Sequence, residues 1–175
     1  MKYILPLLCA ALLLMSFGRK NVCKFPIDNA SGIKNDGIIG TWKWKEDTNK
    51  ANFFEVSRCT SCSSPAYHVK FWDRGGANPT FEANVHFSKV GDATFINVPY
   101  WEGLSSQFRG YFFLKIINAN KGFTDITAAV VNDDQLGSLD QAGLKQRIVA
   151  RVNDPSFYSD TIHLYTFVIT SGIGQ

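Results

Sequence analysis

Apolar and polar residues alternate along much of the chain beyond residue 37, in short runs separated by turn-forming residues. In the run 41–45, Trp42 and Trp44 fall on one side of the alternation and Lys43 and Lys45 on the other. Successive side chains of a β-strand point to opposite faces, so a period of two predicts strands buried on one face. The pattern therefore indicates a domain made mainly of β-strands.

The clearest pair of strands lies at 67–72 and 81–88, on either side of the turn cluster 75–79. Both runs alternate, and the Gly- and Pro-containing segment between them predicts a hairpin. If the loop is centred on residue 77, Phe71 lies opposite Ala83, and every inward pair joins two apolar residues.

Other runs of strand character, with loop segments such as 100–107 between them, cover residues 52–57, 93–98, 109–118, 123–131 and 161–170. One helix is expected where Ser138 and Gln141 form a capping box, with Ser138 as the N-cap. That helix runs to about Arg147, although Gly143 weakens it by ~1 kcal/mol relative to Ala. Residues 148–152 either continue the helix or form a strand.

Strands joined by short turns form a meander, and closing a meander removes its exposed edges. We therefore expect an all-β, mainly antiparallel fold: an up-and-down barrel or half-barrel with one short helix in its C-terminal part. The chain shows neither an internal repeat nor a second domain boundary. The prediction is a single domain over 37–175.

The first 18 residues have a different character from the rest. Lys2 precedes an apolar run up to Met15, and small residues follow it, which is typical of a cleaved signal peptide. The run is shorter than the ~20 residues that span a bilayer as a helix. We therefore predict an exported protein, periplasmic or extracellular, with a flexible leader over 19–36. The alternative is an anchored form, although neither Cys9 nor Cys23 fits a lipidation box well.

Composition narrows the possible partners. Apolar residues make up 45% of the chain and charged residues 19%, a globular balance. The 18 Lys and Arg residues are scattered, whereas a nucleic-acid binder gathers them on one face. We expect no nucleic-acid partner, and membrane contact only through the leader or a lipid anchor. No protein partner can be named from the residues.

Three cysteines remain beyond the predicted signal peptide: Cys23, Cys59 and Cys62. The C-x-x-C of residues 59–62 precedes a strand pattern, not the helix that a redox motif needs. No second cysteine pair offers zinc ligands. The expected role is a disulfide, formed either within the pair or from one of its members to Cys23.

A resemblance to the lipocalins rests on Gly40-Thr41-Trp42, which opens the first strand, and on Thr124-Asp125. The order of elements, with Gly91-Asp92 leading to a strand that ends at Pro99, also resembles exported lipocalin-like proteins of the Bacteroidota. The resemblance implies a barrel that holds a small apolar ligand, with Trp42 packed across its closed end. The late Arg that stacks on this Trp in lipocalins has no counterpart in 161–170.

Aromatic residues are abundant, at 14% of the chain. They either line a ligand cavity or fill a dry core, because an eight-stranded barrel allows both. Exposed aromatics near loops, such as Trp72, Tyr100 and Trp101, would indicate contact with a partner or a carbohydrate. The candidate ligand-binding residues are Trp42, Trp44, Phe53, Phe71, Phe112 and Phe123.

Catalytic and metal chemistry find little support. His68 and His86 face each other in the expected register and could share a metal ion, with Glu82 or His163 as a third ligand. Otherwise they are two surface histidines. Hydrolase and phosphate-binding motifs are absent from the sequence, and Asp125, Asp133 and Asp134 fall in or beside turns, where solvated carboxylates are common.

The sequence thus predicts an exported binding protein for a small apolar ligand, with no catalysis, no cofactor and no metal. The alternative is an envelope interaction module that acts through the loops around Cys59–Cys62 and Tyr100–Trp101. A metal-dependent enzyme is the third hypothesis.

Overall fold

The computed structural model describes residues 22–28, 34, 36–45, 52–62, 66–72, 77–102 and 107–166. The predicted signal peptide lies outside these residues, as does the end of the last predicted strand. Side chains are described for the same residues except 100–102 and 107–108.

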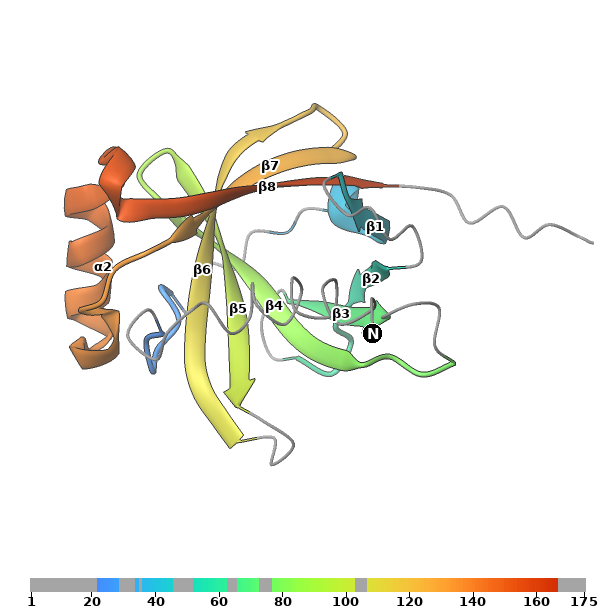
Figure 1. Ribbon diagram of the computed structural model, residues 1–175, viewed down its shortest axis with the longest axis horizontal. Helices are drawn as coiled ribbons and strands as arrows, with labels where there is room; N and C mark the ends of the chain where they lie inside the picture. The colour runs from blue at the N-terminus through green and yellow to red at the C-terminus, as the bar shows by residue number, and fades with distance from the viewer. Residues whose placement is uncertain are drawn as a thin grey trace, which may run out of the picture.

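The eight described strands form one closed antiparallel barrel in which each strand pairs with its neighbours in sequence and β1 pairs with β8. Figure 1 shows the barrel with β7 and β8 crossing above the long, bent β5 and β6. The all-β, up-and-down barrel with one late helix is therefore confirmed. Its elements are η2 (Asp36–Ile38), β1 (Gly40–Trp44), β2 (Phe53–Arg58), β3 (Tyr67–Trp72), β4 (Phe81–Val90), β5 (Ala93–Glu102), β6 (Gln107–Ala119), β7 (Asp125–Val131), η3 (Leu136–Ser138), α2 (Gln141–Arg151), η4 (Pro155–Phe157) and β8 (Tyr158–Thr166).

The largest differences from the expected strand boundaries lie in β5 and β6. β5 extends to Glu102 and β6 begins at Gln107, so the segment predicted as a loop from residue 100 is partly strand. Register shifts interrupt the pairing of β5 with β6, of β6 with β7 and of β7 with β8. Such irregularities bend and twist a sheet, which helps it to close.

The β3–β4 hairpin forms where predicted, but its register is shifted by two residues. Phe71 pairs with Phe81, not with Ala83, and Tyr67 pairs with Val85. An even shift leaves each side chain on its predicted face, so alternation alone cannot distinguish the two registers. The length of the turn decides between them. His68 consequently lies opposite Asn84, not His86.

The middle of the barrel interior is occupied by apolar side chains. Trp42, Val85, Phe87 and Ile126 belong to a buried cluster that draws members from across the barrel, and Trp44 packs against it. Trp42 and Trp44 therefore share the inner face, as the alternation predicts. Burial of these side chains is the main favourable contribution to the stability of the barrel.

A second apolar cluster lies outside the barrel, where α2 covers strands β4 to β7 (Figure 1). Leu144 and Ile148 of α2 are fully buried against outward-facing residues such as Phe95 and Phe113. β-Strands whose two faces are both buried read as continuous apolar runs. This explains the run Tyr111–Leu114, whose residues alternate between the two clusters.

Residues 22–28, here called the N-terminal strap, complete the outer cluster. The backbone of Cys23 exchanges hydrogen bonds with Tyr111 of β6, at 3.0 and 2.7 Å. Ile27 is 1% exposed, and its N–H donates to Oδ1 of the buried Asn97 at 2.9 Å. This docking differs from the poorly ordered leader expected for these residues. Cys23, Phe25 and Ile27 alternate with Lys24, Pro26 and Asp28, but the run is short and contains a proline, so it does not predict a strand.

Helix α2 begins two residues later than predicted. Its N-cap is Asp140, whose Oδ1 accepts from the Gly143 N–H at 2.7 Å. Ser138 ends η3, and its hydroxyl donates to the carbonyl oxygen of Gln135. Ser and Asp are both favoured caps, so the sequence could not rank them. The helix continues to Arg151, which settles the alternative left open for residues 148–152.

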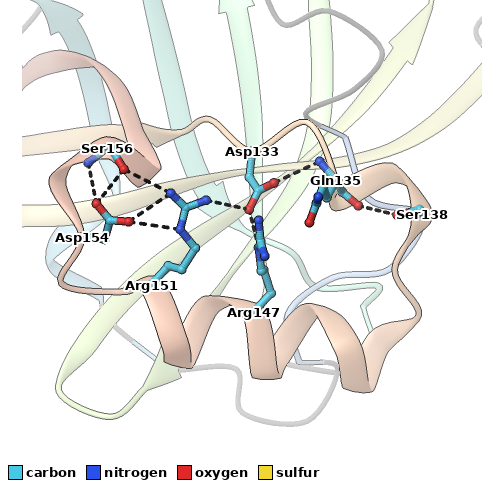
Figure 2. Close-up of polar contacts among 7 residues, drawn as sticks. All are labelled: Asp133, Gln135, Ser138, Arg147, Arg151, Asp154 and Ser156. Atoms are coloured by element: carbon cyan, nitrogen blue, oxygen red, sulfur yellow. Dashed lines mark hydrogen bonds and ion pairs between the residues drawn. The ribbon is translucent and has the colours of Figure 1, made fainter.

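A buried carboxylate ties α2 to the end of β7. Figure 2 shows Arg147 and Arg151 reaching from the helix to Asp133, with Nε to Oδ2 at 2.6 Å and NH1 to Oδ2 at 3.2 Å. Arg151 also binds Asp154, at 3.0 Å. The Asp133 side chain is 1% exposed, so it is not the solvated turn residue expected from the sequence. Paired and hydrogen-bonded, it can remain ionised although it is buried.

Candidate functional site

An aromatic wall lines the inside of β1 to β4. Phe54, Phe71 and Phe81 pair in register across β2, β3 and β4 and form a row of three rings. Trp44 packs against two of them, with ring centroids 5.3 Å from Phe54 and 5.5 Å from Phe71. Trp42 stacks on Phe54 at 6.4 Å, with an angle of 8° between the planes. Tilted and offset aromatic pairs of this kind are favourable beyond the area they bury.

The opposite wall is mostly aliphatic. It is formed by inward side chains of β5 to β8, including Ile96, Leu114, Val130 and Ile162. Phe112 of β6 is the aromatic member of this wall. These residues alternate with outward-facing ones, so the wall follows directly from the period-two pattern.

The two walls enclose a cavity of about 220 Å³. The described side chains that line it are all aliphatic or aromatic, and none of these is ionisable. The row Phe54–Phe71–Phe81 is half-buried, whereas Tyr67 and Val85, further along β3 and β4, are buried. The cavity therefore opens toward the phenylalanine row and closes toward the other end.

Trp42 and Ile38 line the cavity near the closed end. The indole Nε1–H of Trp42 donates to the carbonyl oxygen of Ile38 at 2.8 Å, and both residues are buried. Ile38 ends η2, which is further held by an ion pair between Asp36 and Arg58 at the end of β2.

Of the six predicted ligand-binding residues, four line the cavity: Trp42, Trp44, Phe71 and Phe112. Phe53 does not. It lies on the outer face of β2 and stacks on Trp72 of β3, with ring centroids 5.1 Å apart. Phe123 sits in the turn before β7 with a positive φ of 53° and packs against the interior cluster without lining the cavity.

Phe54, Phe81 and Phe87 also line the cavity but are not among the six candidate residues, although the alternation places Phe81 and Phe87 on the inward face. The signal was present for Phe54, because Phe53 shares its alternation with Glu55 and Ser57, whereas Phe54 shares it with Val56. A charged residue at 55 indicates that this face points to solvent. Phe53 is aromatic like the candidates that line the cavity, but its position in the alternation predicts an outward-facing side chain.

The histidines do not converge. His68 on the outer face of β3 contacts Asn84 through Nδ1 at 2.8 Å and Glu82 through Nε2 at 3.0 Å. His86 is half-buried and its Nε2 bonds the carbonyl oxygen of Asp28 in the strap, at 3.0 Å. His163 lies on β8 beside Thr127. Within the described residues, no three His, Cys, Asp or Glu side chains group as metal ligands would.

The cysteines resolve the pairing question left open by the sequence. Cys59 and Cys62 form a disulfide within the β2–β3 connection. Cys23 is free and 0% exposed, and its thiol donates to the carbonyl oxygen of Leu139 at 3.6 Å. Burial raises the pKa of this thiol. A sulfur enclosed in this way is poorly placed to carry a lipid in the folded protein.

Among the helices of the described segments, none is long and apolar enough to cross a membrane. Comparison of the chain with protein-family models, curated proteins and solved structures finds no match.

Proposed function

We propose that this protein is an exported binding protein that holds a small apolar molecule inside its barrel and performs no chemistry on it. The observation that carries the proposal is the cavity of about 220 Å³ lined by aliphatic and aromatic side chains. Ligand sites in proteins are concave and mostly apolar. A barrel interior that is neither filled nor polar has the character of such a site.

The energetics favour an apolar occupant. Water gains little in a cavity without hydrogen-bonding partners, since a buried water normally makes about three hydrogen bonds. An apolar molecule instead fills the void and regains dispersion contacts that its lining otherwise lacks. An engineered apolar cavity of about 150 Å³ binds benzene for these reasons.

The lining also explains why we propose no catalysis. Acid–base and nucleophilic mechanisms need a titratable or nucleophilic group beside the reacting atoms. The side chains lining the cavity offer none. Export is supported by the predicted signal peptide and by the disulfide between Cys59 and Cys62, since such bonds persist in oxidising compartments.

The proposal is tested by extracting the protein purified from its natural host. Native mass spectrometry should show a mass excess that organic solvent removes, and the extract should contain a stoichiometric apolar molecule. The variant Ile162→Trp fills the cavity and should lose this molecule. Its chain neighbour Thr161 is exposed, so Thr161→Trp should retain it. Equal retention by two folded variants, or a protein with no extractable molecule, would contradict the proposal.

The interaction-module hypothesis has one observation in its favour. The disulfide constrains a connection in which Thr60 and Ser61 are exposed, and a constrained loop loses less entropy when it binds. On this hypothesis, cross-linking in envelope extracts should give a defined adduct that disappears in the Thr60→Lys, Ser61→Lys variant. An unchanged cross-linking pattern would remove this alternative.

A further inference from the structure

The size of the cavity limits the ligand more narrowly than the fold does. If a cavity of about 150 Å³ holds benzene, with its six heavy atoms, one of about 220 Å³ holds on the order of ten. A ligand of that size is compact. Many binding sites for small molecules reach 300–1,000 Å³, and long acyl chains need that larger range.

The two walls differ in chemistry, which restricts the shape of the ligand. The β1–β4 side presents Trp44, Phe54 and Phe71 at mutual angles of 55° and 70°. Aromatic rings gain about 0.5–1.5 kcal/mol from stacking or edge contacts with another ring, beyond the area buried. A flat unsaturated ring that lies against this wall would join the existing cluster. The aliphatic wall opposite would cover its other face without demanding a particular orientation.

The lining also restricts the charge of the ligand. An ionised group taken into the cavity would lose its hydration without gaining an opposite charge from the described lining, in which no side chain is ionisable. The indole N–H of Trp42 is already bonded to Ile38. A carboxylate would therefore have to stay outside the mouth, and ten heavy atoms leave no chain long enough to reach out.

We infer that the ligand is a neutral, compact molecule of about ten heavy atoms built on one or two flat unsaturated rings, bound against the aromatic wall formed by Trp44, Phe54 and Phe71. This inference rests on the proposed function and names its ligand class. It excludes long-chain acids and other extended amphiphiles as the natural occupant.

Three probes with ten carbon atoms separate the parts of the inference. Equilibrium dialysis of the solvent-extracted, refolded protein is carried out with naphthalene, decalin and decanoate, and with the four-ring hydrocarbon pyrene as a size control. Naphthalene should bind at least about twofold more tightly than its saturated counterpart decalin, the lower range of an aromatic contact. Decanoate and pyrene should show no saturable binding.

A pair of variants places the ring. Phe71→Leu keeps an apolar residue in the wall and should weaken naphthalene by about three- to tenfold, with decalin little changed. Phe53→Leu is the matched control, because Phe53 lies on the outer face of the neighbouring strand against Trp72. It should leave the affinity for naphthalene unchanged. Circular dichroism confirms that both variants are folded.

The outcomes are distinguishable. Tighter binding of decalin than of naphthalene, or an equal loss in the two variants, would overturn the placement of a ring on the aromatic wall. Saturable binding of decanoate or pyrene would overturn the inference on size and charge and leave the proposed function standing. Failure of all four probes to bind would contradict the proposed function itself.

Discussion

Trp42 donates its indole N–H to the carbonyl oxygen of Ile38 at 2.8 Å, and neither residue is more than 4% exposed. The bond joins the first strand of the barrel to the 3-10 turn that precedes it. It thereby couples closure of the barrel end to the position of a tryptophan that lines the cavity.

Replacing Trp42 by Phe should destabilise the protein by about 1–3 kcal/mol, because the Ile38 carbonyl would be left buried without its donor. Urea denaturation followed by circular dichroism measures the change. Trp72→Phe is the control, since Trp72 lies outside the barrel and the substitution keeps a ring against Phe53. Equal midpoints for the two variants would show that the bond to Ile38 contributes little.

Asp133→Asn should lower the free energy of unfolding by about 3–5 kcal/mol, the usual loss when one partner of a buried ion pair is removed. Two guanidinium groups, from Arg147 and Arg151, would lose their shared carboxylate. The exposed neighbour Asp134 is the control, and Asp134→Asn should change stability by less than about 0.5 kcal/mol.

The same carboxylate predicts a response to acid. Burial raises the pKa of Asp133, but hydrogen bonds from Arg147 and the Gln135 N–H, with the charges of both arginines, outweigh it and lower the pKa below its ordinary value. Its stabilising contribution is therefore present above about pH 4 and is lost as the pH falls through the lower, folded-state pKa. Urea denaturation at several pH values between 2 and 5 measures this. The free energy of unfolding should depend less steeply on pH in Asp133→Asn than in the native protein.

His86 should make stability depend on pH in a higher range. Burial lowers the pKa of His86, and the bond to the Asp28 carbonyl and the charge of Asp28 oppose this only in part. The unfolded chain then binds a proton that the folded chain resists, so stability falls as the pH drops below about 6.5. The His86 ring also packs edge-to-face against Tyr111, with ring centroids 6.2 Å apart.

The measurement is denaturation between pH 5 and 8 for the native protein and for His86→Gln. The variant keeps a donor for the Asp28 carbonyl but cannot titrate. The slope of its unfolding free energy against pH should therefore be smaller. Lys89→Gln, exposed on the same strand, should keep the native slope. An unchanged slope in His86→Gln would mean that another group governs this range.

Gly110→Ala should dislodge the N-terminal strap. Gly110 has a φ of +140°, and a Cβ there would lie 2.3 Å from the carbonyl oxygen of Cys23. Backbone strain and the clash together should cost at least about 2 kcal/mol. The control is Gly122→Ala, where a Cβ meets only Thr124 Cγ2, at 3.8 Å. Proteolysis near residue 24 should become faster in Gly110→Ala alone, and equal rates would contradict the prediction.

Much of the barrel was predictable because burial on one face leaves a period of two in each strand. The alternation at 41–45 placed Trp42 and Trp44 inside, and the runs at 67–72 and 81–88 placed their residues on the correct faces. The same pattern predicts that Phe53 faces outward, because it shares its face with Glu55. These features are local, so neighbouring residues carry the information.

Other features depend on which distant segments meet. A shift of two residues in the register of the β3–β4 hairpin leaves the alternation unchanged, so the sequence pattern does not reveal it. This shift separates His68 from His86. Burial of Asp133 and Cys23 requires α2 and the N-terminal strap to pack on the outside of the barrel. The sequence by itself determined which faces are apolar and that the strands follow one another in a meander. Only the tertiary structure decided that the enclosed space stays partly open, because side chains from eight strands must meet before a void between them has a volume.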